Sequence, residues 1–190
     1  MKPYALLTIA IAAVSLSAHA ALEAGDAAPL FEAKASLDGK PFDFSLADAL
    51  GKGTVVVYFY PSAYTSGCNV QAHEFSVNMD AFEAAGASVI GVSLDDIDRL
   101  NDFSADPEYC AGNLAVASDP TGDIARSYNL DVHEAVEGAE DTRGAEISHG
   151  FAERVTFIVT PDGKVAETIG GVSPVENVRK TLEAVQRLQM

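Results

Sequence analysis

The 190-residue sequence has few cysteines and few basic residues, and each shortage excludes a class of protein. Its two cysteines, Cys68 and Cys110, do not form C-x-x-C, which excludes an ordinary dithiol–disulfide oxidoreductase. Twelve Lys and Arg residues stand against 28 Asp and Glu residues, so the formal charge is −16 at pH 7. Because such a surface repels nucleic acid and anionic lipid, we expect neither as a partner.

Long apolar runs are also absent after the first twenty residues, so we expect no membrane contact from the rest of the chain. The first twenty residues begin with Met1-Lys2, continue with an apolar run from Tyr4 to Val14, and end in Ala18-His19-Ala20. A basic start, an apolar core shorter than a membrane span and an A-x-A site are typical of a secretory signal. We predict a signal peptide over residues 1–20 and export to the periplasm.

The remaining residues, 21–190, have the length of one globular domain and contain no repeat, low-complexity tract or linker. Apolar strand-like runs alternate with helical patterns, which predicts an α/β domain with a mixed sheet. The expected strands are 30–33, 54–60, 87–93, 114–117, 155–159 and 164–169, with a turn at 37–41. The expected helices are a short turn at 45–50 and the segments 66–85, 95–104, 123–128 and 174–189. The acidic charge favours a neutral small-molecule substrate, unless the acidity serves only solubility.

The acidic segment 131–150 fits no regular pattern, and we predict a solvated loop there. It contains His133 and His149, separated by several carboxylates. A metal site is the less favoured alternative, because this spacing matches no known ligand pattern. We expect no cofactor.

The most informative segment is the spacing P-x-x-x-T-x-x-C formed by Pro61, Thr65 and Cys68 directly after the apolar strand 54–60. Proline cannot donate to a sheet, so the strand should end at Pro61. A helix is expected from Ser66, which places Cys68 in its first turn. Unpaired amide groups and the helix dipole favour a thiolate there. The spacing therefore predicts a reactive cysteine.

Three stretches, 56–61 (VVYFYP), 65–72 (TSGCNVQA) and 154–159 (RVTFIV), resemble the peroxiredoxins, with the peroxiredoxin Q or bacterioferritin comigratory protein type as the nearest branch. The resemblance runs from about Gly25 to the C-terminus. It implies a thioredoxin-like fold, thiol-dependent reduction of hydrogen peroxide and organic hydroperoxides, and a monomer or weak dimer.

The resemblance also implies roles for individual residues. Cys68 is the nucleophile that becomes a sulfenic acid, and the Arg154 guanidinium stabilises its thiolate. Thr65 hydrogen-bonds both sulfur and peroxide, Pro61 shields the thiolate from water, and the amide groups of Gly67 and Cys68 bind the peroxide. Without the motif, Arg154 would be a surface residue, Thr65 a helix N-cap and Pro61 a strand terminator.

One departure concerns the second cysteine. Many relatives carry it five residues after the first, where this chain has His73, for which we expect a surface or packing role. Cys110 resembles the resolving cysteine of another branch, and this implies a Cys68–Cys110 disulfide recycled by a thioredoxin-like dithiol. Because cysteines on separate helices rarely lie at bonding distance, we expect local unwinding around one or both.

Two alternatives to this cycle remain open at the level of sequence. The first is a one-cysteine cycle in which an external thiol resolves Cys68. The second is a non-catalytic binding or holdase module with a structural disulfide.

Overall fold

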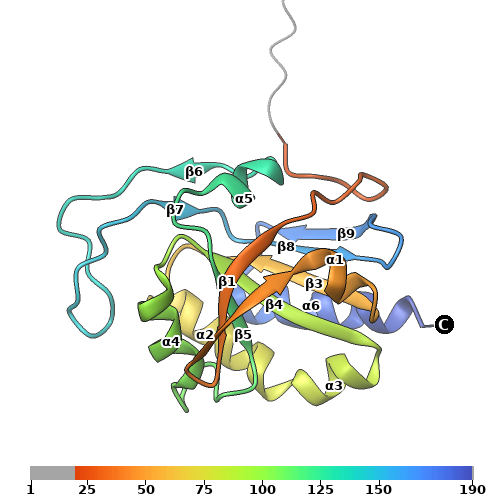
Figure 1. Cartoon of the computed structure of the whole chain (residues 1–190), viewed down its shortest axis with the longest axis horizontal. Coiled ribbons are helices and arrows are strands. Elements are labelled where there is room, and N and C mark those ends of the chain that lie inside the picture. Colours follow the sequence, from red (N-terminus) through yellow and green to blue (C-terminus); the bar gives the residue numbers. More distant parts are fainter. Residues whose placement is uncertain (1–19, 190) are drawn as a thin grey trace, which may run out of the picture.

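A seven-stranded mixed sheet forms the centre of the structure, a computed structural model that describes residues 20–189 (Figure 1). The strand order is β2-β1-β5-β4-β3-β8-β9; β4 pairs in parallel with β3 and β5, and the other pairs are antiparallel. The strands are β1 (Glu32–Leu37), β2 (Lys40–Ser45), β3 (Thr54–Phe59), β4 (Ala87–Ser93), β5 (Ala115–Ser118), β8 (Val155–Val159) and β9 (Val165–Gly170). The predicted α/β domain with a mixed sheet is confirmed.

Helices cover both faces of this sheet, which explains why every residue of the central strand β3 is buried. Side chains of β3 alternate between two apolar clusters, with Val56 and Tyr58 in one, and Val55 and Val57 in the other. The first cluster includes residues of α2 (Ser66–Val77), α3 (Met79–Ala84), α4 (Ile97–Ala105) and α6 (Pro174–Arg187); the second includes residues of α1 (Leu46–Leu50) and α5 (Asp123–Ser127).

Two predictions about elements were wrong or incomplete. The predicted helix 66–85 is divided at Asn78, whose side-chain amide donates to Glu74 O at 2.8 Å and so competes with backbone bonding. Strand β2 was not predicted, although the turn before it was. Asp38 and Gly39 both have positive φ, and this turn joins β1 and β2 into a hairpin.

Strand β6 (Val132–His133) lies inside the segment 131–150 that was predicted as a loop, and it pairs with β7 (Phe151–Ala152), directly after that segment, to form a small second sheet. Figure 1 shows the chain between these strands, coloured cyan, as a long loop that projects from one end of the molecule. No helix within residues 20–189 is long and apolar enough to span a bilayer. The predicted signal peptide lies outside the described residues, apart from Ala20.

Candidate active site

Cys68 lies in the first turn of α2, as the spacing predicts. Strand β3 ends at Phe59, and the loop that begins at Pro61 leads to Thr65, the residue that precedes the helix. The Cys68 side chain is buried, with 1% of the residue exposed. The nucleophile candidate is therefore shielded from bulk water at a helix N-terminus, where backbone N–H groups favour negative charge.

Arg154 contacts this sulfur directly. Its Nη2 lies 3.2 Å from Cys68 Sγ. The topology explains the contact, because β8 pairs antiparallel with β3 and its first residue, Val155, lies opposite Phe59. A Cβ on Gly67 would lie 3.2 Å from Arg154 Nη2, so the glycine leaves room for the guanidinium. A permanently charged group at this distance stabilises a thiolate.

A buried chain of polar side chains holds the other side of that guanidinium. Arg154 Nη1 donates to Gln71 Oε1, and Gln71 Nε2 donates to Asn177 Oδ1 at 2.9 Å. The same oxygen accepts from Thr156 Oγ1 at 2.7 Å, while Asn177 Nδ2 donates to Ile169 O at 3.0 Å. Gln71, Asn177 and Thr156 are all at most 1% exposed. Elements α2, β8, β9 and α6 thus orient Arg154 together.

Thr156 and Asn177 were not predicted as site residues from the sequence. The available signal was a polar residue inside an apolar strand (Thr156) and a polar residue on the buried face of an amphipathic helix (Asn177). Buried polar groups need partners, and such positions therefore point to a hydrogen-bonded network.

Thr65 occupies the N-cap position, but its side chain makes no capping hydrogen bond. Instead, its hydroxyl donates to Ser62 O at 2.9 Å. The hydroxyl proton is therefore engaged, and only its lone pairs remain to accept a hydrogen bond. In the described part of the chain this hydroxyl bonds Ser62 and not the Cys68 sulfur, in contrast to the contact that the resemblance implied.

The backbone N–H groups of Gly67 and Cys68, both expected to bind peroxide, differ in their hydrogen bonding. The Cys68 N–H donates to Thr65 O at 2.9 Å in this state. Gly67, one residue earlier in the same turn, supplies the remaining candidate amide.

Cys110 lies in a turn between α4 and β5 and is completely buried. Both cysteines are free thiols and belong to the same apolar cluster. Burial raises the pKa of the Cys110 thiol far above its usual value, and the nearby Asp106 carboxylate adds to this, so the protonated form is favoured. The exposed His73 bonds Glu108 O at 3.1 Å and so links α2 to the turn that carries Cys110.

Comparison with known proteins identifies the family. The model of the AhpC/TSA family matches residues 24–168. Over 144 residues the sequence is 34% identical to "Peroxiredoxin Bcp" of Escherichia coli strain K12, covering 76% of this chain and 83% of that protein. The chain belongs to the AhpC/TSA family. It is a peroxiredoxin, a thiol-dependent peroxidase and so an oxidoreductase, and the alternative of a non-catalytic binding module is wrong.

Solved structures show the same fold. The peroxidoxin BcpB of Mycobacterium tuberculosis has a TM-score of 0.71 at 24% identity, covering 88% of this chain and 98% of that one. The bacterioferritin comigratory protein of Xanthomonas campestris, whose structures concern its alkyl peroxide reduction activity, has a TM-score of 0.65 at 24% identity, covering 83% and 92%. The peroxiredoxin therefore has the expected thioredoxin-like fold.

In this peroxiredoxin, part of segment 131–150 covers the loop before Cys68, so the prediction of a solvated loop was wrong for that part. Thr142 donates to Tyr64 O from its backbone N at 2.9 Å and from its hydroxyl at 2.8 Å. The Arg143 guanidinium lies 3.2 Å from the centroid of the Tyr64 ring. Asp141 and Ile147 are buried. Asp141, Arg143 and Ile147 thus hold this segment against the rest of the protein. The polar composition of the segment did not indicate these contacts.

Tyr64 itself has a positive φ of 61°, which is unusual for a side chain of this size. Such a conformation persists where neighbouring groups hold it, and Thr142 and Arg143 do so here.

His133 and His149 do not share a metal-binding cluster: within residues 20–189, no three His, Cys, Asp or Glu side chains are grouped to hold an ion.

Proposed function

We propose that this peroxiredoxin reduces hydrogen peroxide and organic hydroperoxides with Cys68 as its nucleophile and Cys110 as its resolving cysteine. The observation that carries the proposal is the 3.2 Å contact between Arg154 Nη2 and Cys68 Sγ at a buried helix N-terminus. Organic hydroperoxides are included because alkyl peroxide reduction is attributed to the Xanthomonas campestris relative.

In the first step, the Cys68 thiolate attacks one peroxide oxygen and the O–O bond breaks. The departing oxygen takes a proton and leaves as water or an alcohol, and Cys68 becomes a sulfenic acid. The guanidinium stabilises the charge that moves from sulfur to the departing oxygen. Thr65, with its proton held by Ser62, accepts a hydrogen bond from the peroxide O–H. Pro61 helps to keep water from the sulfur.

In the second step, the Cys110 sulfur attacks the sulfenic acid, the S–O bond breaks, and water leaves as the disulfide forms. Both cysteines are buried and do not form a disulfide in this structure, so we propose that the segment between α4 and β5 opens before the disulfide forms. It contains no helix or strand, and two consecutive residues, Ala111 and Gly112, have positive φ. A thioredoxin-like dithiol then reduces the disulfide by thiol–disulfide exchange.

A one-cysteine cycle remains the second candidate, because the Cys110 thiol is completely buried and its raised pKa disfavours the thiolate. Peroxide consumption coupled to a thioredoxin system separates the candidates. Cys68→Ser should abolish turnover in both cases. Cys110→Ser should abolish turnover with thioredoxin only in the two-cysteine cycle, and full turnover by this variant would refute the role of Cys110.

We further propose that residues 1–20 direct export to the periplasm and that the mature protein is a monomer or weak dimer. The N-terminal pattern supports export. N-terminal sequencing of protein from the periplasmic fraction should begin at Ala21. Light scattering after size exclusion should give the mass of one chain at micromolar concentration, and a stable larger assembly would contradict the monomer.

A further inference from the structure

A buried carboxylate holds the loop that precedes the nucleophile. Asp95 is 0% exposed and accepts from Ser62 Oγ at 2.8 Å, from Ala63 N at 2.8 Å and from Ser93 Oγ at 2.7 Å. Ser62 in turn accepts the Thr65 hydroxyl through its carbonyl oxygen at 2.9 Å. Asp95 is therefore two hydrogen bonds from the Thr65 side chain.

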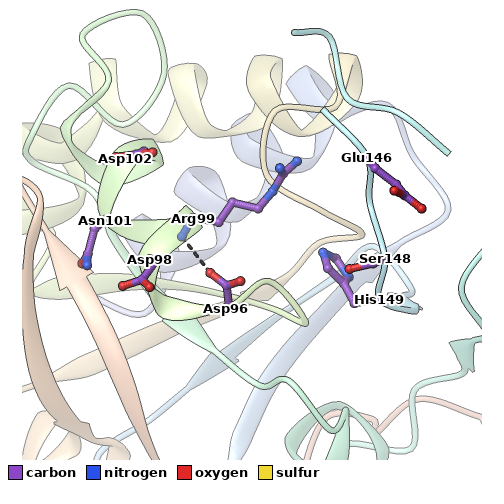
Figure 2. A pocket seen from close by; sticks show the side chains of 8 residues that line it. All are labelled: Asp96, Asp98, Arg99, Asn101, Asp102, Glu146, Ser148 and His149. Carbon is purple, nitrogen blue, oxygen red and sulfur yellow. Dashed lines mark hydrogen bonds between the residues drawn. The ribbon is translucent and has the colours of Figure 1, made fainter. Parts of the chain in front are cut away.

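Arg99, in the first turn of α4, holds the same loop from its other side. Its Nη2 donates to Ala63 O at 2.8 Å and to Asp141 Oδ2 at 2.9 Å, and its Nε lies 2.8 Å from Asp95 Oδ1. The N–H of Ala63 is thus bonded to Asp95 and its C=O to Arg99, the two members of an ion pair whose carboxylate is completely buried and whose guanidinium side chain is 15% exposed. Figure 2 shows Arg99 reaching from its helix toward the segment that carries Glu146, Ser148 and His149.

His149 completes this arrangement in a charged form. Its Nε2 lies 2.9 Å from Asp95 Oδ1, and its Nδ1 lies 2.7 Å from Gly150 O. A carboxylate and a carbonyl can only accept, so both ring nitrogens must carry a proton and the ring is an imidazolium.

The electrostatic surroundings agree with that assignment. Burial and the nearby Arg99 would lower the pKa of His149, but its bond to Asp95 outweighs them and raises the pKa above 6.5. Burial would likewise raise the pKa of Asp95, but the hydrogen bonds from His149 and Ser93 lower it. A cavity of about 500 Å³ lies beside His149, and apart from Arg99 the charged residues that line it are acidic: Asp96, Asp98, Asp102 and Glu146.

We propose that His149, Asp95 and Arg99 are positioning residues of the peroxidase, which hold the Ser62–Ala63 backbone and thereby Thr65 beside Cys68 only while His149 is protonated. The inference rests on the proposed role of Cys68 as nucleophile. When pH rises through the folded pKa of His149, the ring loses one proton and its positive charge. Either Asp95 or Gly150 O then loses its hydrogen-bond donor, and Asp95 loses the cation of its ion pair with His149. Asp95 then binds the loop less firmly, and oxidation of Cys68 slows.

The experiment measures the rate constant of Cys68 oxidation by hydrogen peroxide from pH 5 to 10, in competition with a haem peroxidase. In the wild type, the rate constant should fall at alkaline pH. The midpoint of this fall should equal the midpoint of the His149 titration, followed by NMR at its Cε1–H. His149→Ala should be slower by roughly 10- to 100-fold at pH 6 and lack this fall, because the loop is misplaced at every pH.

His149→Lys supplies a cation that keeps its proton to much higher pH, so it should restore most of the rate without the alkaline fall. His133→Ala, at an exposed histidine of β6, is the matched control and should behave as wild type. Circular dichroism and melting temperature establish that each variant is folded.

A His149→Ala variant with the wild-type rate and profile would overturn the inference. So would a slower variant that keeps the same alkaline midpoint, since its defect would then be structural only. A wild type whose Cys68 does not react with peroxide would contradict the proposed function instead.

Discussion

The chemistry of Cys68 depends on one guanidinium and on the side chains behind it. Arg154 bonds the sulfur with one nitrogen and Gln71 with the other, and Asn177 connects Gln71 to Thr156. A planar cation held from both sides stays in place as charge moves from sulfur to the departing oxygen, which is how preorganised groups lower a barrier.

Replacement of Arg154 tests this directly. Arg154→Lys keeps the charge but cannot contact both Cys68 and Gln71 with a rigid fork, so the rate constant of Cys68 oxidation should fall by about 10²-fold. Competition with a haem peroxidase measures it. Arg187→Lys, at an exposed arginine paired with Glu167, is the control and should leave the rate unchanged. An Arg154→Lys rate within twofold of wild type would refute the role.

Asn177 should matter for both stability and rate, although it does not touch the sulfur. Asn177→Ala leaves Gln71, Thr156 and Ile169 O without their buried partner, which should lower the free energy of unfolding by about 1–3 kcal/mol. Because Gln71 then holds Arg154 less firmly, Cys68 oxidation should also slow.

Urea unfolding and peroxide competition provide the two measurements for Asn177→Ala. Lys180→Ala, at a half-exposed residue of the same helix that pairs only with Glu176 among the described residues, is the control for both. Loss of stability at an unchanged rate would show that Asn177 is structural only.

Individual site residues differed in how far the sequence could reveal them. The sequence predicted the position of Cys68 because strand, proline and helix follow one another locally. The contact of Arg154 came from resemblance to a family, since 86 residues separate it from Cys68. Asn177 and His149 reach the site only through tertiary packing, for which a single sequence carries no spacing rule.

At the scale of elements, strong local patterns predicted β3, β4 and the start of α2 well. The break at Asn78 and the packing of 141–149 depend on side-chain bonds that hydrophobic periodicity does not report. Segment 107–113, which carries Cys110, is held mainly by turns, and its stability should set how fast the disulfide forms.

Gly112→Ala tests this opening. Gly112 has φ +71°, and a Cβ there would lie 2.9 Å from Asp38 Oδ1, so alanine should destabilise the closed turn by about 1 kcal/mol. If the turn must open, the Cys68–Cys110 disulfide should form about fivefold faster after peroxide is added. Acid quenching followed by mass analysis measures that rate.

The control for Gly112→Ala is Gly163→Ala, in the turn between β8 and β9. Gly163 has φ +74° with nothing near its missing Cβ, so the variant carries the same backbone strain far from both cysteines. It should lower the stability of the fold and leave the disulfide rate unchanged. Equal disulfide rates in both variants and the wild type would argue against opening of 107–113.

For the whole molecule, alternating strands and helices were sufficient to predict the fold class, while the export signal stays a prediction. The formal charge of −16 has a kinetic consequence. A hydroperoxide bearing a carboxylate should be repelled at low salt and react roughly 3- to 10-fold faster in 0.5 M salt, whereas neutral tert-butyl hydroperoxide should show no such change. Equal salt dependence of the two substrates would show that net charge does not steer the substrate.

The most direct test of the two-cysteine mechanism is the intact mass of the reduced mature protein after one equivalent of hydrogen peroxide. We expect rapid loss of two hydrogen atoms, with peptide mapping that joins Cys68 to Cys110. Stable addition of oxygen at Cys68 without a crosslink would contradict the role of Cys110. An unchanged mass would contradict the assignment of Cys68 as the nucleophile.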